Sequence, residues 1–106
     1  MIGVRPETFS DIIRGETPVL FDFFAECCGP CRVMKPILEE LHKNMGGKIR
    51  ILKVDVDKSP LVSSAYDVTG VPTLILFQKG NILWRRAGVL PAGRLQKIIN
   101  HFLSQS

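Results

Sequence analysis

All three cysteines of this 106-residue chain fall between positions 27 and 31. Cysteines this close in sequence cannot tie distant loops together, so the chain is not a small scaffold held by disulfides. Its stability must come from buried apolar side chains, and 45% of its residues are apolar. A chain of this length supports one core, and we expect a single domain over residues 1–106. The clustered cysteines therefore mark a functional site.

The apolar residues predict an alternation of helices and strands. Apolar positions three and four apart indicate helices, and compact β-branched or aromatic runs indicate strands. The alternation of strands with helices is followed by Lys79, Gly80 and Asn81, which suit a hairpin that joins two antiparallel strands, so the sheet is predicted to be mixed. In chain order the predicted elements are a helix over 6–14, a strand over 19–25, a helix over 33–45, a strand over 49–56, a helix over 59–66, strands over 73–78 and 82–87, and a helix over 95–103.

Two residues separate Cys28 from Cys31, and the pair stands where a predicted strand passes into a helix. Unpaired N–H groups and the helix dipole at that end favour thiolate over thiol at Cys28. Such a thiolate can attack a disulfide, and Cys31, one helical turn later, can displace the mixed disulfide that forms. The same spacing occurs in zinc sites, but His42 lies 11 residues beyond Cys31, about 16 Å along a helix. We therefore predict a redox pair and no metal site.

Residues 22–32 have the sequence DFFAECCGPCR, which resembles the active-site segment of thioredoxins. The likeness covers nearly the whole chain, and it continues at Pro36, Lys53, Val71, Pro72, Thr73, Gly80 and Gly88. The resemblance implies an α/β thioredoxin fold, in which four helices flank a single central mixed five-stranded sheet in the order βαβαβαββα, the first strand being short. It also implies a thiol–disulfide oxidoreductase without a cofactor.

Asp22 is an acidic residue inside an otherwise apolar predicted strand. Burial penalises the charged carboxylate, which predicts a raised pKa and proton exchange near neutral pH. The resemblance implies that Asp22 exchanges a proton with Cys31 and has Lys53 as its partner. A buried acid that is satisfied by hydrogen bonds or by Lys53 is the alternative. We favour proton transfer because Asp22 stands six residues before Cys28, as in the family.

A second segment is expected to contact substrate. Val71 and Pro72 resemble the family's cis-proline loop, which faces the cysteine pair and offers backbone hydrogen bonds to an extended substrate. Without the resemblance a trans bond would be expected, because only about 5–6% of X–Pro bonds in folded proteins are cis. The resemblance assigns further substrate contacts to Gly29, Pro30 and Gly88.

Cys27 departs from the family pattern, because thioredoxins generally carry tryptophan at this position. We interpret Cys27 as a small residue tolerated at the rim of the site. The alternatives are a vicinal disulfide with Cys28, a thiol that traps a mixed disulfide, and a soft metal ion held with Cys28 and Cys31. Phe24, also often tryptophan in the family, is expected to be structural.

These residues predict a general disulfide reductase that acts on client proteins through Cys28 and Cys31 and receives its electrons from a thioredoxin reductase. A disulfide oxidase or isomerase of the same fold is one alternative, but Pro30 resembles the reducing members. A thioredoxin-like module that binds a partner without turnover is the other alternative, and the intact cysteine pair argues against it.

The net charge of +4 is spread along the chain without a dense basic run, which argues against nucleic-acid binding. Arg32, Lys35, Arg85 and Arg86 are interpreted as solvated surface charge, with steering of acidic partners and support of the Cys28 thiolate as the alternative. No apolar run approaches the about 20 residues that a membrane span requires. We expect a cytoplasmic monomer without a membrane partner.

Overall fold

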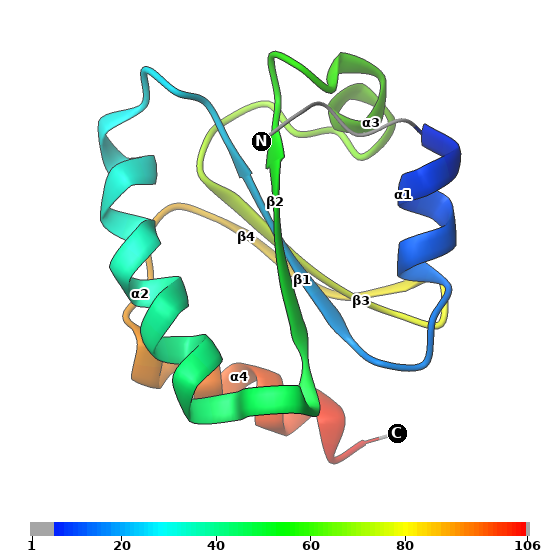
Figure 1. The fold of residues 1–106 in the computed structure, drawn as a ribbon, viewed down its shortest axis with the longest axis vertical. Coiled ribbons are helices and arrows are strands. Elements are labelled where there is room, and N and C mark those ends of the chain that lie inside the picture. The colour runs from blue at the N-terminus through cyan, green and yellow to red at the C-terminus, as the bar shows by residue number, and fades with distance from the viewer. Residues whose placement is uncertain (1–5, 106) are drawn as a thin grey trace.

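The computed structural model describes residues 6–105 as a four-stranded mixed sheet with two helices on each face (Figure 1). In chain order the elements are α1 (Pro6–Ile13), β1 (Val19–Phe24), α2 (Gly29–Met45), the short 3-10 helix η1 (Gly46–Lys48), β2 (Arg50–Asp55), α3 (Pro60–Ala65), β3 (Thr73–Gln78), β4 (Asn81–Ala87) and α4 (Ala92–Leu103). The α/β class and the predicted helices and strands are confirmed.

The number of strands differs from the expectation of five. The sheet contains four strands within the described residues. The expected short first strand would precede α1, and it therefore lies outside residues 6–105. Helix α2 begins at Gly29, within the cysteine motif that was predicted to stand at the start of a helix. Helix α4 begins earlier than its apolar stripe indicates, at Ala92, because its first turn carries few of the apolar residues that make a helical pattern visible.

The strands lie in the order β2-β1-β3-β4. β1 is parallel to β2, to which it is connected through α2, and antiparallel to β3, while β3 and β4 form the hairpin. The predicted mixed sheet is thus confirmed. In the hairpin turn Lys79 and Gly80 both have positive φ, 53° and 83°, and glycine adopts that conformation without a steric penalty.

Each face of the sheet has its own hydrophobic core. Along β1 successive side chains point to opposite faces: Leu20 packs with α2 and α4, whereas Phe21 and Phe23 pack with α1 and α3. Phe9 of α1 covers the second core, with its ring centroid 4.4 Å from that of Phe21. None of the helices within residues 6–105 is long and apolar enough to cross a membrane.

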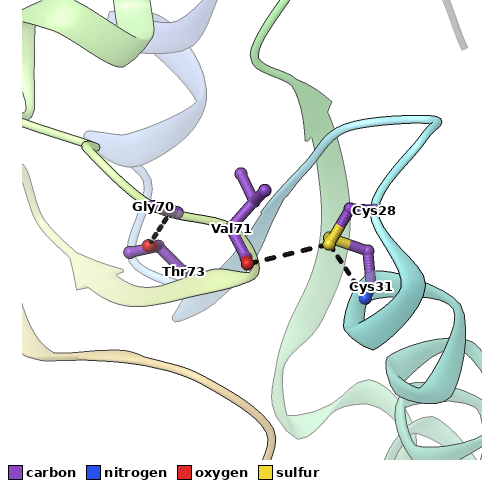
Figure 2. The surroundings of a disulfide bond; sticks show 5 residues. All are labelled: Cys28, Cys31, Gly70, Val71 and Thr73. Atoms are coloured by element: carbon purple, nitrogen blue, oxygen red, sulfur yellow. Dashed lines mark hydrogen bonds between the residues drawn. A yellow bond between two sulfur atoms is a disulfide. The ribbon is translucent and has the colours of Figure 1, made fainter.

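The antiparallel register of β1 and β3 positions the site. Phe23 near the end of β1 pairs with Thr73, the first residue of β3. The segment that leaves β1 toward α2 therefore lies beside the segment that enters β3. Because the first segment contains the cysteines and the second contains Val71 and Pro72, the fold brings the two predicted halves of the site together (Figure 2).

Candidate redox site

Cys28 and Cys31 are joined by a disulfide where α2 begins (Figure 2). Cys28 directly precedes the first helical turn, with extended backbone angles, and its Sγ accepts a hydrogen bond from the backbone N–H of Cys31 at 3.1 Å. Pro30 lies in the first turn, where backbone N–H groups have no acceptor within the helix, so the N–H that proline lacks costs no helical hydrogen bond. The first N–H groups of a helix have no partner within it, so this one is available to stabilise negative charge on the Cys28 sulfur.

The two cysteines differ in accessibility. Cys31 lies in the first turn of α2 and is 5% exposed, whereas Cys28 is half-buried and is followed by the exposed residues Gly29 and Pro30. A sulfur atom of another protein therefore reaches Cys28 more easily than Cys31. The geometry agrees with the order of attack predicted from the sequence.

The loop before β3 faces the disulfide. The carbonyl oxygen of Val71 lies 3.7 Å from Sγ of Cys28 (Figure 2), a separation at which a reduced Cys28 thiol can donate a hydrogen bond to it. The peptide bond between Val71 and Pro72 is cis. The Gly88 N–H donates to the Pro72 carbonyl at 2.8 Å, so the three predicted positions Val71, Pro72 and Gly88 lie together, with the Val71 carbonyl facing Cys28.

Thr73 supplies a further contact of this loop that sequence reasoning missed. Its hydroxyl donates a hydrogen bond to the carbonyl oxygen of Gly70 at 2.6 Å (Figure 2). The bond closes the turn that contains Val71 and Pro72. Its sequence signal is a hydroxyl residue immediately after the proline, which is too common a pattern to single out.

Asp22 is fully buried, and neither of its carboxylate oxygens has a hydrogen-bond partner among the described residues. Lys53 stands opposite Asp22 in the parallel register of β1 and β2. Burial raises the pKa of Asp22 from 3.8 to about 6, and the positive charge of Lys53 opposes this rise by a smaller amount. This direction agrees with the raised pKa that the apolar surroundings of Asp22 predict.

A hollow beside the disulfide connects the buried cysteine to Lys53. Both Cys31 and Lys53 line it, together with Phe24, Ala25, Glu26, Arg32 and Lys35. The Lys53 ammonium lies over the Phe24 ring, 4.8 Å from its centroid. The Phe24 ring thus makes a cation–π contact with a lysine that lines the same hollow.

Cys27 is exposed and free. Because the disulfide joins Cys28 to Cys31, the vicinal disulfide between Cys27 and Cys28 is not formed in this structure. The Cys28 N–H donates to the Ala25 carbonyl at 3.2 Å, which turns the chain between them. On this turn Glu26 pairs with Lys58 at 3.4 Å.

The four cations predicted to surround the site have different surroundings. Arg32, Lys35 and Arg86 are exposed, in agreement with solvated charge. Arg85 is exposed as well, but its guanidinium also donates to the carbonyl oxygens of Tyr66 and Asp67, at 2.6 Å and 3.1 Å. The description of Arg85 as solvated charge was therefore incomplete, because nothing in the local sequence reveals a bond to a loop 18 or 19 residues away.

The fold and the site together define a small α/β protein with one dithiol–disulfide pair at a helix N-terminus, faced by a proline loop. The family model for thioredoxin matches residues 1–101 of this chain. Thioredoxin 1 of Chlorobaculum tepidum is 37% identical over 92 residues, covering 86% of this chain and 91% of the relative. Thioredoxin of Rhodospirillum rubrum is 40% identical over 85 residues, covering 80% and 82%. The chain therefore belongs to the thioredoxin family.

The chain is also similar to a chloroplastic thioredoxin and to two thioredoxins with solved structures. The chloroplastic thioredoxin Y of Oryza sativa is 38% identical over 98 residues, which are 89% of this chain but only 58% of the rice protein. Chloroplastic thioredoxin z has a solved structure that superposes with a TM-score of 0.85 at 30% identity, over 98% of this chain and 95% of the other. A mutant thioredoxin from Halobacterium salinarum NRC-1 superposes with a TM-score of 0.83 at 32% identity, over 95% and 87%.

Family membership and the bonded cysteines establish the class of activity. Thioredoxins are protein-disulfide oxidoreductases, and this chain carries the corresponding disulfide between Cys28 and Cys31. The protein is therefore a thiol–disulfide oxidoreductase.

Proposed function

We propose that this thioredoxin works in the reducing direction, as a general reductase of disulfides in client proteins. The observation that carries the proposal is the arrangement of the two sulfurs. Cys28 is accessible and next to the Val71 carbonyl, while Cys31 is buried behind it. Pro30 between the cysteines, which resembles the reducing members of the family, supports the direction.

The first step is attack by the Cys28 thiolate on a client disulfide. A mixed disulfide between Cys28 and the client forms, and the other client sulfur leaves as a thiolate. The N–H of Cys31, 3.1 Å from the Cys28 sulfur, stabilises the attacking charge. Gly29 and Pro30 at the start of α2 are expected to contact the client. Val71, Pro72 and Gly88, in the loops that face this helix end, are expected to contact it from the other side.

The second step releases the client. Cys31 loses its proton to the carboxylate of Asp22 and attacks the Cys28 sulfur, which forms the Cys28–Cys31 disulfide and expels the second client thiolate. Lys53 keeps the pKa of Asp22 from rising further. Two electrons have then passed from the protein to the client. A thioredoxin reductase restores the dithiol, as it does for thioredoxins generally.

The setting of this reaction is also a proposal. Reduction of client disulfides suits a reducing compartment, so we place the protein in the cytoplasm, as a monomer with disulfide-containing proteins as its partners. Pulldown with a Cys31→Ser variant, which cannot resolve the mixed disulfide, would identify the clients.

Reduction of insulin disulfides by wild type, Cys28→Ser and Cys31→Ser tests the mechanism. We expect multiple turnovers for wild type, background for Cys28→Ser, and a single unresolved mixed disulfide for Cys31→Ser. Each variant is also made with Cys27→Ser, because the free Cys27 thiol would otherwise offer a substitute. Equal background activity in all three would contradict the proposal and favour a binding module.

The reduction potential tests the direction. Equilibration with glutathione should give a value below about −200 mV, since thioredoxin lies near −270 mV and strong oxidants near −120 mV. A value above about −150 mV would identify a disulfide oxidase instead.

A further inference from the structure

Arg85 connects β4 to the chain that leads into the site. Its guanidinium donates through Nη1 to the carbonyl oxygen of Tyr66 at 2.6 Å and through Nη2 to that of Asp67 at 3.1 Å. Arg85 pairs with Ile75 across the β3–β4 ladder, and Ile75 belongs to the core under α1 and α3. The side chain therefore starts from a fixed strand and reaches the end of α3.

The bonded carbonyls stand at the start of the client-facing loop. Tyr66 follows the last residue of α3, and Asp67 has a φ of 54°, in the left-handed region. The Val68 N–H donates a hydrogen bond to the Ser63 carbonyl at 2.9 Å. Val71 follows three residues after Val68. A non-glycine residue keeps a left-handed conformation only where its surroundings hold it. The two bonds from Arg85 are part of those surroundings.

The far end of the same loop is held separately. The Thr73 hydroxyl donates to the Gly70 carbonyl, and the Gly88 N–H donates to the Pro72 carbonyl. Arg85 acts at the other end of the loop, where it adds two side-chain hydrogen bonds to the backbone bonds that Asp67 and Val68 donate to Ser64 and Ser63. Carbonyls at the C-terminus of a helix carry partial negative charge, so a cation with two fixed donors binds them well.

We propose that Arg85 is a positioning residue, whose paired hydrogen bonds hold the loop of residues 66–72 so that Val71 meets a client opposite Cys28. The inference rests on the proposed function, because it concerns how that same site receives a protein substrate. Arg85 does not contact the disulfide. Its loss therefore weakens client binding and leaves the intrinsic chemistry of Cys28 unchanged.

Steady-state kinetics of Arg85→Gln test the proposal with two substrates, insulin and a small aromatic disulfide. We expect the KM for insulin to rise about fivefold with kcat within twofold, as loss of charge-assisted bonds at an exposed position suggests. The rate with the small disulfide should not change, because that substrate does not need the loop. Arg86→Gln is the matched control, since Arg86 is the exposed neighbouring arginine on β4, and it should behave as wild type.

The Arg85→Lys variant distinguishes positioning of the loop by paired hydrogen bonds from an effect of the positive charge alone. Lysine keeps the positive charge but loses the two-pronged geometry, so its insulin KM should resemble that of Arg85→Gln. Full recovery by Arg85→Lys would overturn the proposal in favour of electrostatic steering. Parallel loss with both substrates would overturn it too, because the defect would then lie in folding or in Cys28.

Hydrogen exchange supplies a readout that does not depend on activity. Amides of residues 68–71 should exchange at least about threefold faster in Arg85→Gln than in wild type or Arg86→Gln. Faster exchange with an unchanged insulin KM would overturn the positioning role while leaving the reductase intact. A wild type that reduces neither substrate would overturn the proposed function itself, and this inference with it.

Discussion

Asp22 and Lys53 stand directly opposite each other in the parallel register of β1 and β2, and Asp22 is fully buried there. No described residue hydrogen-bonds the Asp22 carboxylate, so burial outweighs the attraction of Lys53 and raises the pKa of Asp22 to about 6. A group with this pKa holds a proton at mildly acidic pH and releases it near neutrality. The pair therefore suits a proton acceptor rather than a permanent ion pair.

Replacing Asp22 by asparagine should slow the release of clients from the mixed disulfide. We expect Asp22→Asn to lower kcat for insulin reduction about 10- to 100-fold near pH 7, where proton removal from Cys31 is needed. The deficit should shrink above about pH 9, because hydroxide then removes the proton of a cysteine without help. A pH–rate profile of both proteins checks this. Unchanged turnover at every pH would remove Asp22 from the mechanism.

The same substitution should change how stability depends on pH. Below about pH 4 the acid is protonated in both folded and unfolded chains, whereas between 3.8 and about 6 only the folded chain keeps the proton. Wild-type stability is therefore lost as pH rises through this window, and the difference in pKa corresponds to about 3 kcal/mol. In urea unfolding of the oxidised proteins, Asp22→Asn should gain about that amount over wild type between pH 3.5 and pH 8.

The exposed acid Asp57 provides the control for this measurement. Asp57→Asn should follow the wild-type curve to within about 0.5 kcal/mol, as surface substitutions generally do. Parallel curves for wild type and Asp22→Asn would mean that burial does not raise the pKa of Asp22.

Removing the charge of Lys53 should raise the pKa of Asp22 further. Lys53 lowers that pKa by its positive charge, so Lys53→Met should shift the titration of the Asp22 carboxyl carbon, followed by NMR, above about pH 6. Lys35 lines the same hollow but is not among the causes of the shift, and Lys35→Met should leave the titration in place. A fall in the Asp22 pKa in Lys53→Met would contradict the account.

Periodicity predicted the elements of this fold because most of them bury one continuous apolar stripe or run. The start of α4 was placed too late, since its first turn, which follows Pro91, carries little of that signal. The sequence also predicted Asp22 and the cysteines, whose residue types are conspicuous against their surroundings. Local residues and family likeness were sufficient for these features.

Bonds between distant segments were not predictable in the same way. Arg85 reaches Tyr66 and Asp67 through a side chain whose direction depends on the β3–β4 register. Such contacts depend on the assembled fold, because no spacing or composition encodes them.

Cys27 should remain a free thiol throughout the redox cycle. Oxidised protein treated with iodoacetamide should gain one adduct, and peptide mapping should place it on Cys27, because Cys28 and Cys31 are bonded to each other. Cys27→Ala should keep insulin reduction within about twofold of wild type, as expected for an exposed residue outside the core. A peptide with a bond between Cys27 and Cys28 would show instead that the neighbouring thiol exchanges with the redox pair.

Gly88 and Gly93 should respond to alanine with opposite signs. Gly88 has a φ of 100°, which alanine adopts only with strain, and no atom lies within 4 Å of the added Cβ. Gly88→Ala should therefore cost about 1–2 kcal/mol through the backbone alone, and it should raise the insulin KM by disturbing the N–H bond to Pro72. Gly93 lies in α4 with equally open surroundings and no positive φ. Gly93→Ala should stabilise the protein by about 0.5–1 kcal/mol, because alanine has the higher helix propensity. Urea midpoints that move in the same direction would show that side-chain space rather than backbone conformation governs Gly88.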